Sequence, residues 1–327
     1  MYMTSWAEVN STSKQAHVNK SKLDHKSKID QWRNPQSLDP LYTRIAQDLQ
    51  AGRPLIVSAY YGMWHVRAKK PERNLNWGGR YGHAVMMKKS KKNKHVKKLY
   101  RYVNWKLVYE AQSTEMSKQN TLRTLVFTQK IRVPKAWRKY FTRSNNQKKI
   151  PRTMKVFLVM YAYESQEQAA LDMVVNLRQN QDQIITFDDH TKIDVGQSQI
   201  TGYFGHNFFY DYEQFEWDGF QQITGSVTQA KGVFAVGCKT ARVPGFHTLI
   251  TPNVHALLFS RTLMASEGYS TLALVDGILR AYSSEQLAKF ANKTYKYFQK
   301  LERPHRKVGR PFVSHRYKMY PRANLLD

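Results

Sequence analysis

Short apolar runs rich in β-branched and aromatic residues recur along most of this 327-residue chain. Runs of four to six such residues, bounded by Gly, Pro or polar residues, predict strands that are buried in a sheet. They lie at 54–58, 156–161, 184–187, 200–204 and 232–236. Apolar positions at helical spacing predict helices that begin near Asp39, Gln166 and Ser284. Two further apolar segments, 254–263 and 267–282, are expected to be buried helices.

The order of these elements predicts an α/β fold with a mostly parallel sheet flanked by helices. The strand at 156–161 is followed by a helix that Ser165 caps, with Gln168 at its third position, and then by the strand at 184–187. A strand, a helix and a strand within about thirty residues form a βαβ unit, whose two strands are parallel.

Two residues with reactive side chains follow successive apolar runs. His206 comes after the run at 200–204 and Gly205, and Cys238 comes after the run at 232–236 and Gly237. Cys238 is the only cysteine of the chain, and His206 precedes it by 32 residues. Side chains just beyond the carboxyl ends of parallel strands face the crevice in which open α/β sheets bind ligands. The pair is therefore a candidate base and nucleophile, and the alternative is that Cys238 is a buried residue that only packs.

The chemistry of a thiol nucleophile sets further requirements on this region. A thiol attacks as its thiolate, which a neighbouring imidazole favours. The reaction also needs donors for the developing oxyanion, and backbone N–H groups at a glycine-flanked strand end supply them. Gly205, Asn207 and Gly237 are the candidate loop positions for these donors.

This arrangement resembles the caspase-like cysteine peptidases, which include caspases, legumains, clostripain and gingipains. In that family one strand ends in His-Gly and the next ends in Ala/Gly-Cys, and the resemblance covers about 150–299 with 54–58 as a first strand. It implies that His206 is the general base, that Cys238 is the nucleophile, and that the N–H groups of Cys238 and Asn207 form the oxyanion hole, with no cofactor and no metal. The chain departs from the family in having Asn207 after the histidine, so a catalytically inactive member of this fold is an alternative.

An acidic, aromatic-rich segment follows His206 and suggests a preference among substrates. Asp211 and Glu213, with Glu216 and Asp218 beyond them, are candidates for a pocket that accepts a basic residue at the cleavage site of a peptide or protein substrate. The alternative is an exposed acidic loop. Asp188, Asp189 and His190 lie together, but no second cluster at ligand spacing accompanies them, so no metal site is predicted.

The formal net charge of +28 is concentrated in one central block and in the tail at 300–327. Residues 65–152 carry 25 Lys and Arg against 3 Asp and Glu, whereas 153–299 carry 11 against 14. Such asymmetry predicts a surface that meets a nucleic acid or another polyanion, with Trp137, Tyr140 and Phe141 as rings on which bases stack. The candidate polyanion-binding residues are Lys88, Lys89, Lys91, Lys92, Lys94, Lys97 and Lys98. A nucleic-acid-binding protein that meets its polyanion through 65–152 and the tail at 300–327 is therefore the alternative function, and a solvated insertion is the alternative for the basic region.

These patterns predict a division of the chain into four parts. Residues 1–35 form a polar arm, 36–64 and 153–299 form the caspase-like α/β domain, 65–152 form a basic insertion or accessory region, and 300–327 form a basic tail. Glu267 and Asp276 lie in otherwise apolar segments, and a buried carboxylate needs a partner. No leader and no apolar run long enough to span a bilayer is recognised, so a cytoplasmic protein is expected, with a secreted form as the alternative.

Overall fold

The computed structural model covers the sheet, the helices around it and most of their connections. It describes residues 36–63, 71–74, 76–112, 121–141, 150–180, 182–206, 223, 225–242, 246, 249–305 and 307–314.

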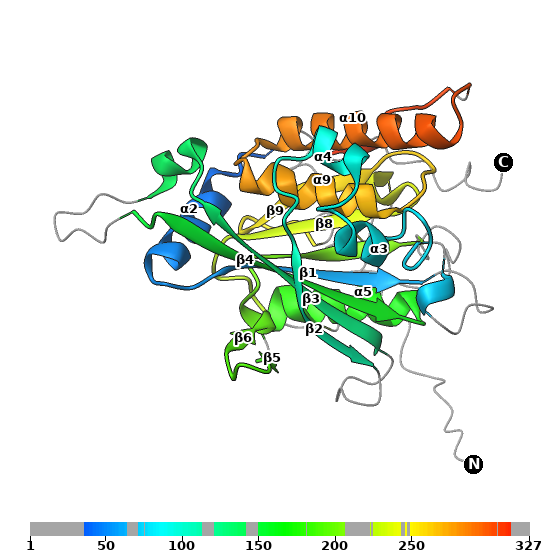
Figure 1. The fold of residues 1–327 in the computed structure, drawn as a ribbon. Helices are drawn as coiled ribbons and strands as arrows, with labels where there is room; N and C mark the ends of the chain where they lie inside the picture. Colours follow the sequence, from blue (N-terminus) through cyan, green and yellow to red (C-terminus); the bar gives the residue numbers. More distant parts are fainter. Residues whose placement is uncertain are drawn as a thin grey trace, which may run out of the picture.

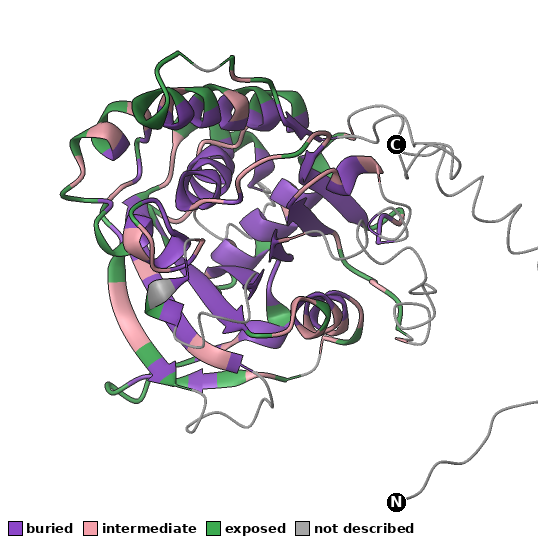
Figure 2. Ribbon diagram, turned by 90° about the vertical axis from the view of Figure 1, so that its right-hand side faces the viewer, coloured by how far each residue is buried: buried purple, intermediate pink, exposed green. Residues whose placement is uncertain are grey.

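Eight strands form one sheet in the order β10-β9-β8-β7-β1-β4-β3-β2. The strands are β1 (Leu55–Gly62), β2 (Lys106–Gln112), β3 (Thr121–Arg132), β4 (Thr153–Tyr163), β7 (Ile200–Gly205), β8 (Lys231–Val236), β9 (Val254–Ser260) and β10 (Phe312–Val313). The five central strands, from β4 to β9, are parallel to one another, and β10 and β3 pair antiparallel with their neighbours. Most strands are buried along their whole length (Figure 2). The predicted α/β class with a mostly parallel sheet is confirmed.

Helices cover both faces of this sheet (Figure 1). One face packs against α2 (Asp39–Gln50), α3 (His83–Lys88), α4 (Lys94–Leu99), α9 (Gly268–Leu279) and α10 (Ser284–Glu302). The other face packs against α5 (Gln166–Gln179) and a separate hairpin of β5 (Ile184–Thr186) and β6 (Lys192–Asp194). Short 3-10 helices occur at η1 (Pro71–Arg73), η3 (Lys135–Tyr140), η4 (Val195–Gln197) and η5 (Thr240–Arg242).

Two helices begin where their capping residues predict. The Ser165 hydroxyl accepts a hydrogen bond of 3.1 Å from the backbone N–H of Gln168 at the start of α5. Ser283 and Gln286 form a complete capping box at the start of α10. Each cap satisfies backbone N–H groups that the first turn of a helix leaves without an intrahelical partner.

Two predicted elements are wrong. Residues 254–260 form strand β9 instead of a helix, because a strand buried on both faces has the same continuous apolar sequence as a buried helix. The segment at 184–187 does not join the main sheet, since β5 pairs antiparallel with β6 in a hairpin between α5 and β7. The parallel strand that follows α5 in the main sheet is β7.

The basic region 65–152 contributes to the same sheet and core. Its strands β2 and β3 continue the sheet beyond β4, and Met87 and Val96 pack in the core of the α9 face. Trp137 is fully buried and donates its indole N–H to the carbonyl of Leu279 at 3.0 Å. Tyr140 and Phe141 are buried too. The expectation that these three rings stack on bases is therefore wrong, because they form part of the core.

Candidate active site at the carboxyl edge of the sheet

His206 and Cys238 follow β7 and β8, which are parallel neighbours in the centre of the sheet. The ladder between these strands runs from Ile200↔Gly232 to Phe204↔Val236, so paired residues differ by 32 in number. His206 and Cys238 differ by the same number and follow the last pair by two positions. Paired residues on adjacent strands lie about 5 Å apart. His206 and Cys238 therefore follow the carboxyl ends of neighbouring parallel strands at equal offsets from the last ladder pair.

Gly205 is required at the end of β7 by a close approach of two strands. It has a φ of +154°, and a Cβ at this position would lie 2.4 Å from the carbonyl oxygen of Gly62 on β1. The Tyr203 hydroxyl donates a 2.7 Å hydrogen bond to the carbonyl of His206. Gly205 and Tyr203 together hold the backbone of the partly exposed His206 against the sheet edge.

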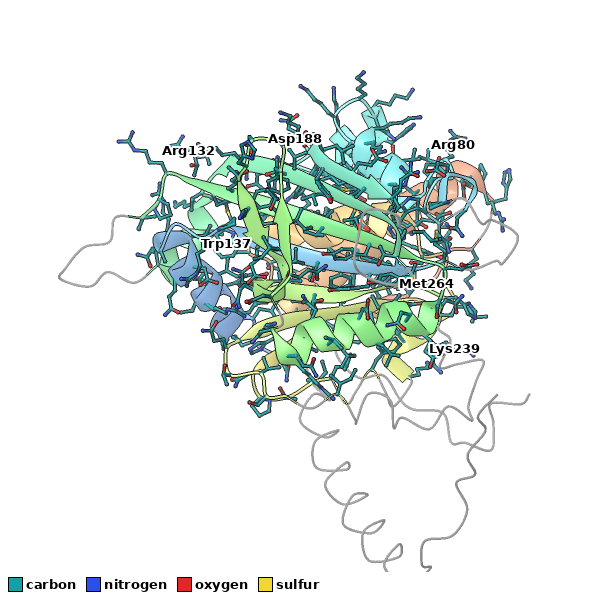
Figure 3. The ribbon with its side chains drawn as sticks, turned by 90° about the horizontal axis from the view of Figure 1, so that it is seen from below. Arg80, Arg132, Trp137, Asp188, Lys239 and Met264 are labelled. Atoms are coloured by element: carbon teal, nitrogen blue, oxygen red, sulfur yellow. The ribbon has the colours of Figure 1, made fainter. Side chains whose placement is uncertain are left out.

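Cys238 is partly exposed and lies in a turn that several hydrogen bonds hold in place. Its thiol donates to the carbonyl of Met264 over 3.5 Å, and the backbone N–H of Lys239 donates to the carbonyl of Thr262 over 3.1 Å. The Thr240 hydroxyl donates to the carbonyl of Ala235 at 2.6 Å and closes the turn on β8. Figure 3 shows Lys239 and Met264 at the end of the molecule opposite Trp137. Cys238 as a residue is thus partly exposed, and its side chain contacts the loop that follows β9.

A buried histidine fixes this loop. His83 on α3 donates through Nε2 to the carbonyl of Ser266 at 3.2 Å, and its Nδ1 accepts from the Thr271 hydroxyl at 2.7 Å. Tyr61 on β1 can then donate to the same hydroxyl at 3.2 Å. Burial lowers the pKa of His83 to about 3, so this imidazole is neutral at physiological pH. Ser266 also donates to the carbonyl of Val236 at 3.2 Å, which ties the loop to the end of β8.

His83 and Ser266 are parts of this region that the sequence does not predict. His83 contacts residues that are more than 180 positions away along the chain. Its one local signal is its place before the apolar residues Ala84 to Met87. A histidine beside such an apolar run more often marks packing in the core than a functional site.

Glu267 lies at the entrance to α9 and is largely buried, with one carboxylate oxygen lacking a hydrogen-bond partner. Burial raises its pKa to about 7, with Glu302 adding to the shift while Tyr269 and Arg303 oppose it. In the unfolded chain the pKa of a glutamate is about 4.3. The folded protein therefore binds one more proton than the unfolded chain between these values, and its stability falls as the pH rises through this range.

We expect the Glu267→Gln variant to be more stable than the wild type at pH 8, by up to about 3 kcal/mol, and to differ little from it at pH 4.5. The amide replaces the carboxylate without a charge to desolvate. Thermal unfolding at both pH values measures the difference. The exposed Glu164→Gln variant serves as the control, and an equal gain at both pH values in Glu267→Gln would contradict the assignment.

The remaining predicted site residues fall into three groups. Gly237 is buried in the turn before the thiol. Asn207, Asp211 and Glu213, with Glu216 and Asp218, lie outside the described residues. The candidate polyanion-binding residues Lys88, Lys89, Lys91, Lys92, Lys94, Lys97 and Lys98 are all exposed on α3, α4 and the turn between them.

The described residues contain neither a metal-binding cluster nor a membrane-spanning helix. Within the described ranges, no three side chains of His, Cys, Asp or Glu are grouped so as to hold a metal ion. Asp189, from the acidic pair before His190, instead accepts hydrogen bonds from the backbone and hydroxyl of Thr191. No helix in the part of the chain that the structure describes is long and apolar enough to cross a membrane.

The comparisons of this chain with known proteins give no match. No protein-family model matches the chain, and no match is found among curated proteins or solved structures. The resemblance to caspase-like peptidases therefore stays a prediction, and an assignment of function depends on the geometry at the edge of the sheet.

Proposed function

We propose that this protein is a cysteine endopeptidase of the caspase-like kind in which His206 and Cys238 act as a catalytic dyad. The observation that carries the proposal is the shared register: the 32-residue offset of the β7–β8 ladder equals the spacing between the two residues. Side chains alternate between the two faces of a sheet along each strand. Phe204 and Val236, the last pair of this ladder, both pack in the core on the α9 face.

The surroundings of the thiol support the same chemistry. Cys238 is partly exposed instead of sealed in the core. Its thiol donates to the Met264 carbonyl, so the proton transfer to His206 requires the thiol to turn from that carbonyl to the imidazole.

The proposed reaction is acyl transfer followed by hydrolysis. His206 accepts the thiol proton, and the sulfur attacks the peptide carbonyl carbon to form a thioester while the C–N bond breaks. The imidazolium returns its proton to the leaving amine. Water then attacks the thioester with His206 as base, which releases the carboxylic acid and restores the thiol. The proposal includes a preference for a basic residue at the cleavage site, with Asp211 and Glu213 as the acidic residues that pair with it.

We expect the wild type to cleave fluorogenic peptides with Arg or Lys at the cleavage site. His206→Gln is expected to lose cleavage by about 10²–10⁴-fold, the usual contribution of general base catalysis. Cys238→Ser is expected to lose at least as much, since a hydroxyl is a far weaker nucleophile than a thiolate. The rate of fluorescence release measures both losses.

The exposed His305→Gln variant is a matched control and should retain wild-type rates. Cleavage that survives Cys238→Ser would come from a contaminating peptidase and would overturn the proposal. A folded wild type that cleaves no peptide of this panel would also overturn it, in favour of a catalytically inactive protein of this fold.

A further inference from the structure

A stripe of lysines runs along the outer face of α10. Lys289, Lys293, Lys296 and Lys300 follow one another at spacings of four, three and four residues, and all four are exposed. The opposite face of the helix buries Leu287, Phe290, Ala291 and Phe298 in the core. Residues three or four positions apart lie on one side of a helix, so these ammonium groups form a single row about 16 Å long. No acidic residue occurs between Glu285 and Glu302.

The basic helix α4 lies against this row. The His95 Nδ1 atom is 2.9 Å from the hydroxyl of Tyr297 on α10, and the Lys98 ammonium lies 5.5 Å from the centre of the Tyr297 ring. Figure 1 likewise shows α4 beside α10, on the face of the sheet opposite α5. Lys94, Lys97 and Lys98 of α4 therefore adjoin the row on α10. Together these seven lysines are here called the α4–α10 lysine surface.

The charges of this surface are not balanced within the described part of the fold. Lys88, on the neighbouring α3, pairs with Glu110 at 3.1 Å, whereas none of the seven lysines forms an ion pair with a described carboxylate. Like charges held close together repel each other and lower the stability of the folded state. A polyanionic partner would offset this repulsion.

The side chains around the lysines indicate which polyanion fits. A helix that binds a membrane surface inserts an apolar face among the lipids. The apolar face of α10 is buried in the protein, and its exposed face offers ammonium groups, with Leu301 at its very end as the exposed large apolar residue. A row of cations without apolar neighbours suits a regular array of phosphates, and duplex DNA carries one charge about every 1.7 Å along its axis.

We propose that the α4–α10 lysine surface binds the phosphate backbone of nucleic acid without reading its sequence. This site is separate from the proposed dyad, and its binding does not require Cys238 to react. Affinity is then expected to depend steeply on salt and weakly on sequence, because contacts to phosphate carry charge and position but no base information.

The test is fluorescence anisotropy with a labelled 20-base-pair DNA duplex and with a single strand of the same length, at several salt concentrations. The triple variant Lys293→Gln, Lys296→Gln and Lys300→Gln removes three charges and keeps good helix-forming residues. We expect it to reduce the slope of log affinity against log salt by about 2.7, and to weaken binding on the order of tenfold or more at 0.15 M salt.

A matched triple variant, Lys106→Gln, Lys130→Gln and Lys155→Gln, removes three exposed lysines from the strands β2, β3 and β4. Lys155 lies over the ring of Phe157, which packs in the core on the α5 face, opposite to α10. This control should bind DNA nearly as the wild type does. Equal loss in both triple variants would overturn the proposal, because binding would then follow net charge alone. Binding to vesicles that contain phosphatidylserine, together with no binding to either nucleic acid, would overturn it in favour of a membrane.

Discussion

Replacing Asp276 by alanine is expected to lower the free energy of unfolding by about 3–5 kcal/mol. Asp276 lies in the last turn of the apolar helix α9 and is fully buried. Its Oδ1 atom accepts the backbone N–H groups of Arg101 and Tyr102 at 2.8 and 2.7 Å. Its Oδ2 atom lies 2.7 Å from the Arg280 Nη2 atom. The two groups form an ion pair, but their alignment does not meet that of a hydrogen bond. Alanine leaves two N–H groups and one cation without their acceptor.

Asp276→Asn is the control for this effect. It keeps an oxygen for the two N–H groups and loses only the charge, so a smaller loss of about 1–2 kcal/mol is expected. Chemical denaturation followed by circular dichroism measures both variants. An equal loss in the two variants would show that the N–H groups of 101 and 102, which follow α4, do not depend on this carboxylate.

Gly202→Ala is expected to lower the free energy of unfolding by about 3 kcal/mol or more, because β7 cannot move away from β8. A Cβ at Gly202 would lie 2.2 Å from the carbonyl oxygen of Phe234 and 2.5 Å from the Phe234 ring. Gly202 pairs with Ala59 on one side and Phe234 on the other, in the centre of the sheet. The same strands lead to His206 and Cys238, so the variant is expected to disturb the candidate site as well.

Gly309→Ala is the matched control for Gly202→Ala. No atom lies within 4 Å of a Cβ at this position, and the change in unfolding free energy is expected to be close to zero. Thermal unfolding of the two variants separates a specific clash from a general effect of alanine. A Gly202→Ala protein as stable as Gly309→Ala would mean that β7 and β8 are less closely packed than described.

The strands that lead to the candidate site could be predicted from local sequence. The predicted runs 200–204 and 232–236 correspond to β7 (Ile200–Gly205) and β8 (Lys231–Val236). Each run is short, apolar and bounded by glycine, and Gly205 is also required by the approach of Gly62. Capping residues likewise fix the starts of α5 and α10, since a cap is a contact between residues only three positions apart.

Elements buried on all sides could not be distinguished in the same way. Strand β9 (Val254–Ser260) and helix α9 (Gly268–Leu279) are both apolar without a polar face, so periodicity gives no sign of which is which. Their lengths of 7 and 12 residues are the better guide, because strands are usually shorter than helices.

The lysines of α10 escaped prediction for a different reason. Averaged over 153–299, charge is slightly negative, and the average hides a helix whose outer face is wholly basic between its ends. The same spacing that predicts the buried face, with Leu287, Phe290 and Phe298, also places Lys289, Lys293 and Lys296 together. The contact of α4 with α10 through His95 and Tyr297 joins residues 202 positions apart, which local sequence does not reveal.

The central claim is that His206 activates Cys238, and the rate of alkylation by iodoacetamide between pH 5 and 9 tests it most directly. Cys238 is the only cysteine, so the appearance of S-carbamidomethylcysteine reports on this site alone. If His206 activates Cys238, the wild type is alkylated at pH 6–7 well above the rate of an ordinary thiol, whose pKa is about 8.5. The rate in His206→Gln is then expected to fall toward that of an ordinary thiol. A wild-type profile that matches His206→Gln and rises only toward pH 8.5 would contradict the claim.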